Sequence, residues 1–249
     1  MTNKPQAIPC SEYAKQFLFA AHDPNNNTTL IPDCYKFIDN QLYTKIGKQI
    51  HPNIRLILET IYQLAPKRIW EVGCGIGFNL YSLRLLLPDA ELYGCDICDE
   101  GLQISKELYP NLNATLITQN ISFPNPEEHP YTDITYTHAV LMHILDYDEY
   151  LLGLRNMFNR TEKQVIIVEN WCDRDYVADI LKVTTWDNTY LYTRIAPEVN
   201  RNLVIIASQV PLDYEPLTNY REQMYLPLVR DMKKGGDNSK YGMITYANT

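Results

Sequence analysis

The sequence lacks the features that mark membrane, secreted and nucleic-acid-binding proteins. No stretch approaches the roughly 20 apolar residues of a membrane-spanning helix. The first residues, MTNKP, do not begin the apolar block of a secretory signal. Lysine and arginine number 22 against 30 acidic residues, and the resulting net charge of −8 argues against nucleic acid as the main partner. We therefore expect a cytoplasmic protein that neither spans a membrane nor binds nucleic acid.

Cysteine is also scarce, with six residues scattered over a chain of 249. A chain of this length buries enough apolar surface to fold without disulfide bonds, so we interpret the thiols as reduced. Cys95 and Cys98 form a single C-x-x-C pair. Because no second pair accompanies it, we interpret it as neither a zinc site nor a redox centre.

What the sequence does contain is a regular alternation of predicted strands and helices. Pro52 opens a helix whose apolar residues recur at three- and four-residue steps, and β-rich runs follow at intervals. Strands are predicted at 68–72, 91–95, 114–118, 134–137 and 164–168, and helices from 52, from 78, at 99–108 and around 150–158. This alternation predicts an α/β fold, a parallel sheet with helices on both faces. Two later runs, 190–194 and 203–207, predict an antiparallel hairpin.

Composition divides the chain into three predicted parts. Residues 1–50 are polar and rich in asparagine, so we interpret them as an accessory or lid segment. Residues 51–210 carry the alternating elements and form the main domain. Residues 211–249 are a C-terminal extension that either closes the site or joins a second subunit, so the chain is a monomer or a homodimer.

Three glycines, Gly73, Gly75 and Gly77, stand at alternate positions between the first predicted strand of this domain and the helix after it, in EVGCGIGFN. The spacing differs from the G-x-G-x-x-G of dinucleotide sites, because the third glycine comes one residue early. No phosphate-binding G-K-[ST] follows. The acidic Glu71 just before the glycines would repel a phosphate and favour an ammonium group. An oxidoreductase that uses NAD is therefore the less favoured alternative.

The run EVGCGIG resembles the first motif of class I S-adenosylmethionine-dependent methyltransferases, which has the form acidic-x-G-x-G-x-G. The resemblance extends from about 51 to 207. It implies a Rossmann-like, seven-stranded, mostly parallel sheet whose last strand is antiparallel. It also implies S-adenosylmethionine as the cofactor, with its amino-acid moiety and ribose lying against the glycines.

Three further residues are expected at the cofactor. Asp96 follows the second strand of this domain, where a carboxylate can accept hydrogen bonds from both ribose hydroxyls. In the TQNIS segment the family commonly carries an acid that holds the adenine amine. Here the residue is Asn120, whose amide oxygen can accept the same bond, and the backbone N–H of Ile121 can reach a ring nitrogen.

The segment DITYTHAVLMHI is similar to one found in methylases of bacterial sugar and surface-glycan biosynthesis. The resemblance places His138 at a strand end that faces the methyl group and His143 about one helical turn further. Methyl transfer to a hydroxyl needs a group that removes a proton near neutral pH, so His138 is the first candidate for the general base. The alternatives are that His138 only contacts the cofactor and that His143 only lines the pocket. Some relatives bind a metal through acids at the positions of Ala139 and Met142, and we expect no metal here.

Glu169, Asn170 and Trp171 end the fifth strand of this domain and are expected to bind the acceptor. Polar groups beside an aromatic ring suit a sugar, although Trp171 could equally be part of the core. The favoured prediction is O-methylation of a sugar or glycan. Two alternatives stay open. One is N-methylation of a small amine or protein terminus, with Glu169 and Asp173 holding a cation, and the other is a non-catalytic protein that binds adenosylmethionine.

Overall fold

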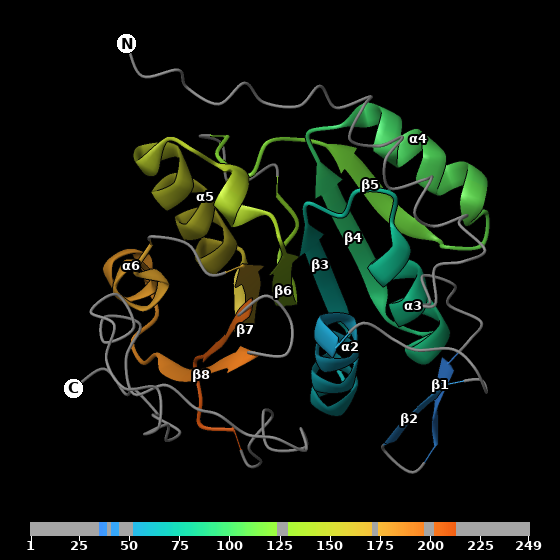
Figure 1. The fold of residues 1–249 in the computed structure, drawn as a ribbon, viewed down its shortest axis with the longest axis horizontal. Helices are drawn as coiled ribbons and strands as arrows, with labels where there is room; N and C mark the ends of the chain where they lie inside the picture. Colours follow the sequence, from blue (N-terminus) through green and yellow to red (C-terminus); the bar gives the residue numbers. More distant parts are fainter. Residues whose placement is uncertain are drawn as a thin grey trace.

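The computed structural model describes residues 35–38, 41–44, 52–123, 129–170, 174–196 and 202–212. Its centre is a seven-stranded sheet in the order β5-β4-β3-β6-β7-β9-β8 (Figure 1). The strands are β3 (Arg68–Val72), β4 (Glu91–Asp96), β5 (Ala114–Thr118), β6 (Thr132–His138), β7 (Thr161–Asn170), β8 (Tyr190–Ala196) and β9 (Asn202–Ser208). All neighbouring pairs are parallel except those that involve β9, which runs antiparallel to both β7 and β8. The predicted mostly parallel, Rossmann-like sheet with an antiparallel last strand is confirmed.

The helices cover the two faces of this sheet. They are α2 (Pro52–Leu64), α3 (Phe78–Leu86), α4 (Asp99–Leu108), the short 3-10 helix η3 (Leu141–His143), α5 (Tyr147–Asn159) and α6 (Tyr176–Val183). Apolar residues of α2, α3 and α4 share one core cluster, and those of α5 and α6 share the other. Among the described helices, none is long and apolar enough to cross a membrane.

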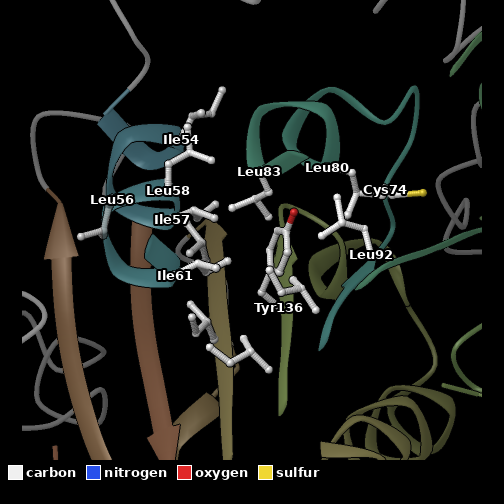
Figure 2. Close-up of a cluster of buried hydrophobic side chains, with 14 of the residues drawn as sticks. Ile54, Leu56, Ile57, Leu58, Ile61, Cys74, Leu80, Leu83, Leu92 and Tyr136 are labelled. Atoms are coloured by element: carbon white, nitrogen blue, oxygen red, sulfur yellow. The ribbon is translucent and has the colours of Figure 1, made fainter. Parts of the chain in front are cut away.

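Neighbouring residues of each strand point to opposite faces and so enter different cores. In β3, Ile69 joins the cluster under α2 and α3, whereas Trp70 joins the cluster under α5 and α6. Figure 2 shows the first cluster, in which α2 and α3 lie over the sheet and Tyr136 of β6 is among their neighbours. The central strands are therefore covered on both faces.

The structure also contains elements that the sequence did not predict. The helix α6 was missed, although Tyr176, Val177, Ile180 and Val183 recur at helical spacing and are buried. A hairpin of β1 (Tyr35–Ile38) and β2 (Gln41–Thr44) lies in the segment expected to be irregular. It packs near α3 and α2. The rest of the expected lid, residues 1–34, 39–40 and 45–50, lies outside the described residues. So does nearly all of the expected C-terminal extension, residues 213–249.

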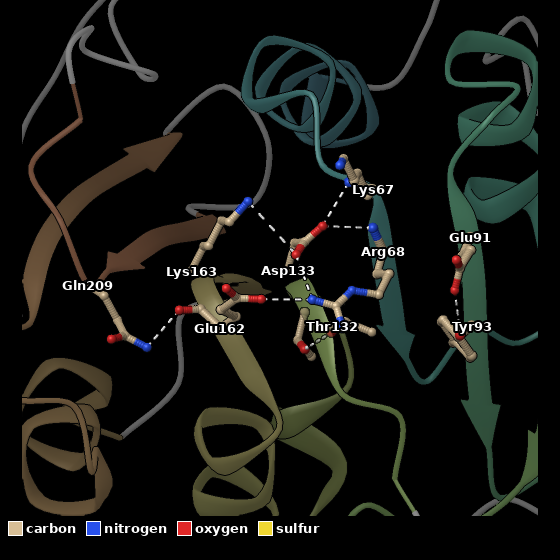
Figure 3. A network of polar contacts seen from close by, with 10 residues as sticks. Lys67, Arg68, Glu91, Tyr93, Thr132, Asp133, Glu162, Lys163 and Gln209 are labelled. Atoms are coloured by element: carbon tan, nitrogen blue, oxygen red, sulfur yellow. Dashed lines mark hydrogen bonds and ion pairs between the residues drawn. The ribbon is translucent and has the colours of Figure 1, made fainter.

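The amino ends of the central strands carry a network of ion pairs (Figure 3). Asp133 of β6 accepts hydrogen bonds from the backbone N–H groups of Lys67 and Arg68 at 2.8 and 3.0 Å. Its carboxylate also pairs with the Arg68 guanidinium at 3.0 Å and with Lys163 at 3.8 Å. The carboxyl ends of the same strands carry the residues described next.

Candidate active site

The three glycines form the turn from β3 to α3, all with positive φ angles of 72°, 51° and 72°. A Cβ added at Gly73 would overlap the side chain of Val140, and one added at Gly77 would overlap Ser105. These two glycines are therefore required by close packing. A Cβ at Gly75 would meet no atom within 4 Å. Gly75 thus borders open space, as expected of a backbone that a ligand approaches.

Glu71 lies beneath this turn with only 1% of its surface exposed. Its Oε1 accepts a hydrogen bond from Nδ2 of Asn79 at 2.8 Å. Its Oε2 is buried and receives no hydrogen bond of ordinary geometry within the described part of the chain. Burial raises the pKa of Glu71 to about 8, although hydrogen-bonding groups of Asn79 and Tyr136 oppose the shift. A cation placed nearby would stabilise the ionised carboxylate.

Asp96 is the last residue of β4 and is partly exposed. Its Oδ2 accepts a hydrogen bond from the backbone N–H of Gly75 at 2.8 Å, and its Oδ1 accepts one from Cys98 at 2.8 Å. Each carboxylate oxygen has a second lone pair, so both can still accept a hydroxyl. Asp96 therefore joins the glycine turn to the start of α4 while keeping capacity for a ligand.

Asn120 and Ile121 follow β5 at the same end of the sheet. The amide oxygen of Asn120 accepts a hydrogen bond from the backbone N–H of Ser122 at 2.9 Å, which closes a local turn. The side chain remains exposed. The carbonyl of Ile121 accepts from Asn156 at 2.7 Å, and this bond anchors the turn to α5. A contact between these two residues and an adenine ring stays a prediction.

The two histidines lie at the end of β6 and on the 3-10 helix that follows it. His138 is the last residue of the strand, with Nε2 3.5 Å from Nδ2 of Asn53 in α2. His143 is the last residue of η3 and is well exposed. Neighbouring protein atoms nevertheless desolvate its imidazole enough to lower its pKa. Both side chains are thus near the carboxyl end of the sheet, where open α/β folds bind their ligands.

The three expected acceptor-binding residues have different placements. Glu169 is buried in β7, and its carboxylate accepts hydrogen bonds from the turn after β6. Asn170 ends β7, but its side chain is outside the described residues, as is all of Trp171. An acceptor contact therefore stays a prediction for Asn170 and Trp171, whereas the contacts of Glu169 point to another role.

Residues 70–160 match the family model described as "Methyltransferase domain". This stretch is a methyltransferase domain. It contains the glycine turn, Asp96, Asn120 and both histidines. The match confirms the predicted enzyme class and, with it, S-adenosylmethionine as the cofactor. Among curated proteins, none matches the chain.

Solved structures of methyltransferases share the fold at low sequence identity. A TehB-like SAM-dependent methyltransferase from Corynebacterium glutamicum is 17% identical, with a TM-score of 0.55 over 80% of this chain and 96% of its own. An O-methyltransferase family protein from Burkholderia thailandensis is 10% identical, with a TM-score of 0.53 over 63% of this chain and 55% of its own. Magnesium protoporphyrin IX methyltransferase from Synechocystis, solved with bound SAH, is 14% identical, with a TM-score of 0.50 over 64% of this chain and 82% of its own. These likenesses concern the fold.

The residues present in the methyltransferase domain fit the cofactor. Gly75 leaves open space, Glu71 holds a buried oxygen without a hydrogen bond of ordinary geometry, and Asp96 retains lone pairs at the adjoining strand end. Glu71 would attract the ammonium group and Asp96 the ribose hydroxyls. Sequence reasoning missed Asn79, which orients Glu71, although it stands two residues after the last glycine. It also missed Val140, because no local pattern shows that this side chain covers Gly73.

Proposed function

We propose that the methyltransferase domain transfers a methyl group to a hydroxyl of a small polar acceptor, a sugar or glycan. The observation that carries the proposal is the position of His138. It ends β6, next in the sheet to β3, whose carboxyl end leads into the glycine turn. The partly exposed imidazole is there a candidate to receive the proton of an acceptor hydroxyl near neutral pH.

Each residue has a defined part in the proposed reaction. S-Adenosylmethionine, when bound, supplies an electrophilic methyl carbon and a neutral thioether leaving group. His138 accepts the proton of the acceptor hydroxyl as its oxygen attacks that carbon in line. The Asn53 side chain, with its amide nitrogen 3.5 Å from Nε2 of His138, restricts rotation of the ring. Which ring nitrogen carries the proton depends on the tautomer, so Nδ1 and Nε2 are both candidate bases.

The principal alternative is methyl transfer to nitrogen, which would need carboxylates to hold a cationic acceptor. Glu169 was one of the two candidates, and both of its oxygens accept hydrogen bonds from protein groups. Asp173, the second candidate, lies outside the described residues. The contacts of Glu169 therefore give no support to a cationic acceptor, and the position of His138 supports the oxygen acceptor.

A two-stage experiment tests the proposal. Calorimetry with S-adenosylhomocysteine and with NAD first distinguishes the cofactors, and only the former should bind. The protein is then incubated with radiolabelled S-adenosylmethionine and a panel of nucleotide-sugars, oligosaccharides, small amines and peptides. Label in a sugar hydroxyl supports the proposal, label in an amine moves the preference to nitrogen, and binding with no acceptor in any class indicates a non-catalytic protein.

A further inference from the structure

Glu169 makes an unusual set of contacts for a residue at a strand end. Its Oε1 accepts hydrogen bonds from the Thr137 hydroxyl at 3.0 Å and from the backbone N–H groups of Val140 and Leu141 at 3.0 and 3.1 Å. Its Oε2 accepts one from the N–H of Met142 at 3.3 Å. The side chain is buried, with 1% exposed. Burial raises the pKa of Glu169, and these four bonds oppose that shift because they favour the ionised form.

The carbonyl groups of the same turn have a second partner. The guanidinium of Arg174 donates hydrogen bonds to the carbonyl of Leu141, at 2.6 Å, and to that of Ile144. Its Cζ lies 4.1 Å from the ring centroid of Tyr150, so the aromatic face of α5 orients it further. Glu169 thus binds the N–H groups of the turn, and Arg174 binds its C=O groups.

The turn that is held in this way links the glycine turn to the histidines. The side chain of Val140 covers Gly73, because a Cβ added at that glycine would overlap it. At the other end of the turn stands His143. Ala139, at the start, has a φ of 56°, a left-handed conformation that is unfavourable for alanine. Such a conformation persists where surrounding contacts impose it, and it is common at functional sites.

We propose that Glu169 and Arg174 form a clamp that fixes the turn Ala139–Ile144 against the glycine turn and so positions His138 and His143 for methyl transfer. The inference rests on the proposed function. It assigns Glu169 to positioning, in place of the acceptor contact expected from the sequence. A carboxylate suits this part because hydrogen bonds to an ionised acceptor are stronger than those to a neutral one.

Two substitutions at Glu169 test the clamp with graded effects. Glu169→Gln keeps the size of the side chain and one acceptor oxygen, but its amide nitrogen would face the N–H of Met142. Glu169→Ala leaves all four donors without their partner. With the acceptor found by the screen above, we expect kcat to fall by about 10²-fold for alanine, the cost of misplacing a reacting group by about 1 Å, and by less for glutamine.

A second readout needs no acceptor. The His143 imidazole is titrated by NMR in the free protein, where Arg174, Glu169 and His138 are the ionisable groups of the turn and its clamp. If Glu169→Ala loosens the turn, water reaches the imidazole and its pKa rises towards the ordinary value. The affinity for S-adenosylhomocysteine should change less than kcat does, because Gly75 and Asp96 themselves are untouched.

Asp133→Asn is the matched control, because Asp133 is also a buried carboxylate that accepts backbone N–H bonds. It should lower the melting temperature but leave both kcat and the His143 titration unchanged. An unaltered kcat and titration in both Glu169 variants would overturn the clamp, as would an equal change in Asp133→Asn. Failure of the wild-type protein to bind S-adenosylhomocysteine would instead refute the proposed function, and the titration would still report on the turn.

Discussion

At the amino ends of the strands, the buried carboxylate of Asp133 lies among cations, whereas at the carboxyl ends Glu71 and Glu169 accept hydrogen bonds from neutral groups. Burial pushes the pKa of Asp133 up, but hydrogen bonds from Arg68 and Lys67 and the charge of Lys163 outweigh it, so the pKa is lowered. Burial dominates for Glu71 and Glu169, whose pKa values are raised. At the amino ends, cations of the protein itself therefore stabilise the ionised form of the buried acid. At the carboxyl ends, Glu71 is left for a ligand and Glu169 holds a turn.

The sharpest test of this difference is to fill the open space at the carboxyl end. Gly75→Val should abolish binding of S-adenosylhomocysteine, measured by calorimetry, because the new side chain occupies the space that Gly75 leaves. Valine also strains a residue with a φ of 51°. Gly75→Asn serves as the comparison, since asparagine tolerates the left-handed region better and is of similar bulk. Unchanged affinity in both variants would refute the cofactor position.

Removing the candidate base should have the next largest effect. His138→Ala should lower kcat by about 10²–10⁴-fold, the usual range for loss of a general base, and should remove the acidic limb of the pH–rate profile. Affinity for S-adenosylhomocysteine should barely change. His143→Ala is the matched variant and should cost less turnover. If His143→Ala is the inactive variant, the two roles are reversed, and if both stay active, nitrogen methylation becomes the preferred reaction.

The positions of these groups were partly readable from the sequence. The glycines follow β3, Asp96 ends β4 and His138 ends β6. The pattern of alternating strands and helices brings these strand ends to one edge of a sheet. The part played by Glu169 was not readable, because its partners lie 27 to 32 positions earlier in the chain. Arg174, 33 positions after Leu141, was missed for the same reason. A local sequence pattern predicts where a residue lies in a strand or turn, but not which distant residues contact it.

The stability of the two ends should respond to pH in opposite directions. The folded-state pKa of Glu71, raised from 4.5 to about 8, means that the folded protein binds more protons than the unfolded chain in this interval. Its contribution is therefore fully present below about pH 4.5 and is lost as the pH rises through about 8. Asp133, with a lowered pKa, contributes above the unfolded value of 3.8 and loses this contribution in acid.

Glu71→Gln separates these two contributions. Urea unfolding of the free protein from pH 5 to 8 should show that the variant loses less stability than the wild type across this range. The difference should reach a kcal/mol or more, since one pKa unit corresponds to about 1.4 kcal/mol. Asp133→Asn should alter the acid limb and leave the pH 5 to 8 slope intact. Identical slopes for wild type and Glu71→Gln would show that burial does not raise the pKa of Glu71.

Chelation should have the smallest effect, because Glu169 is already engaged by the turn after β6. Both oxygens of Glu169 accept hydrogen bonds from backbone N–H groups. Ala139 and Met142, in the turn beside it, offer no carboxylate. Within the described residues, no group of three histidine, cysteine, aspartate or glutamate side chains could hold a metal ion. Turnover with the acceptor from the screen should therefore persist in excess EDTA. Loss of activity that magnesium or manganese restores would mean that a carboxylate outside this clamp binds a metal. Acids at the carboxyl ends of the strands would then also be paired with a cation, as Asp133 is at the amino ends.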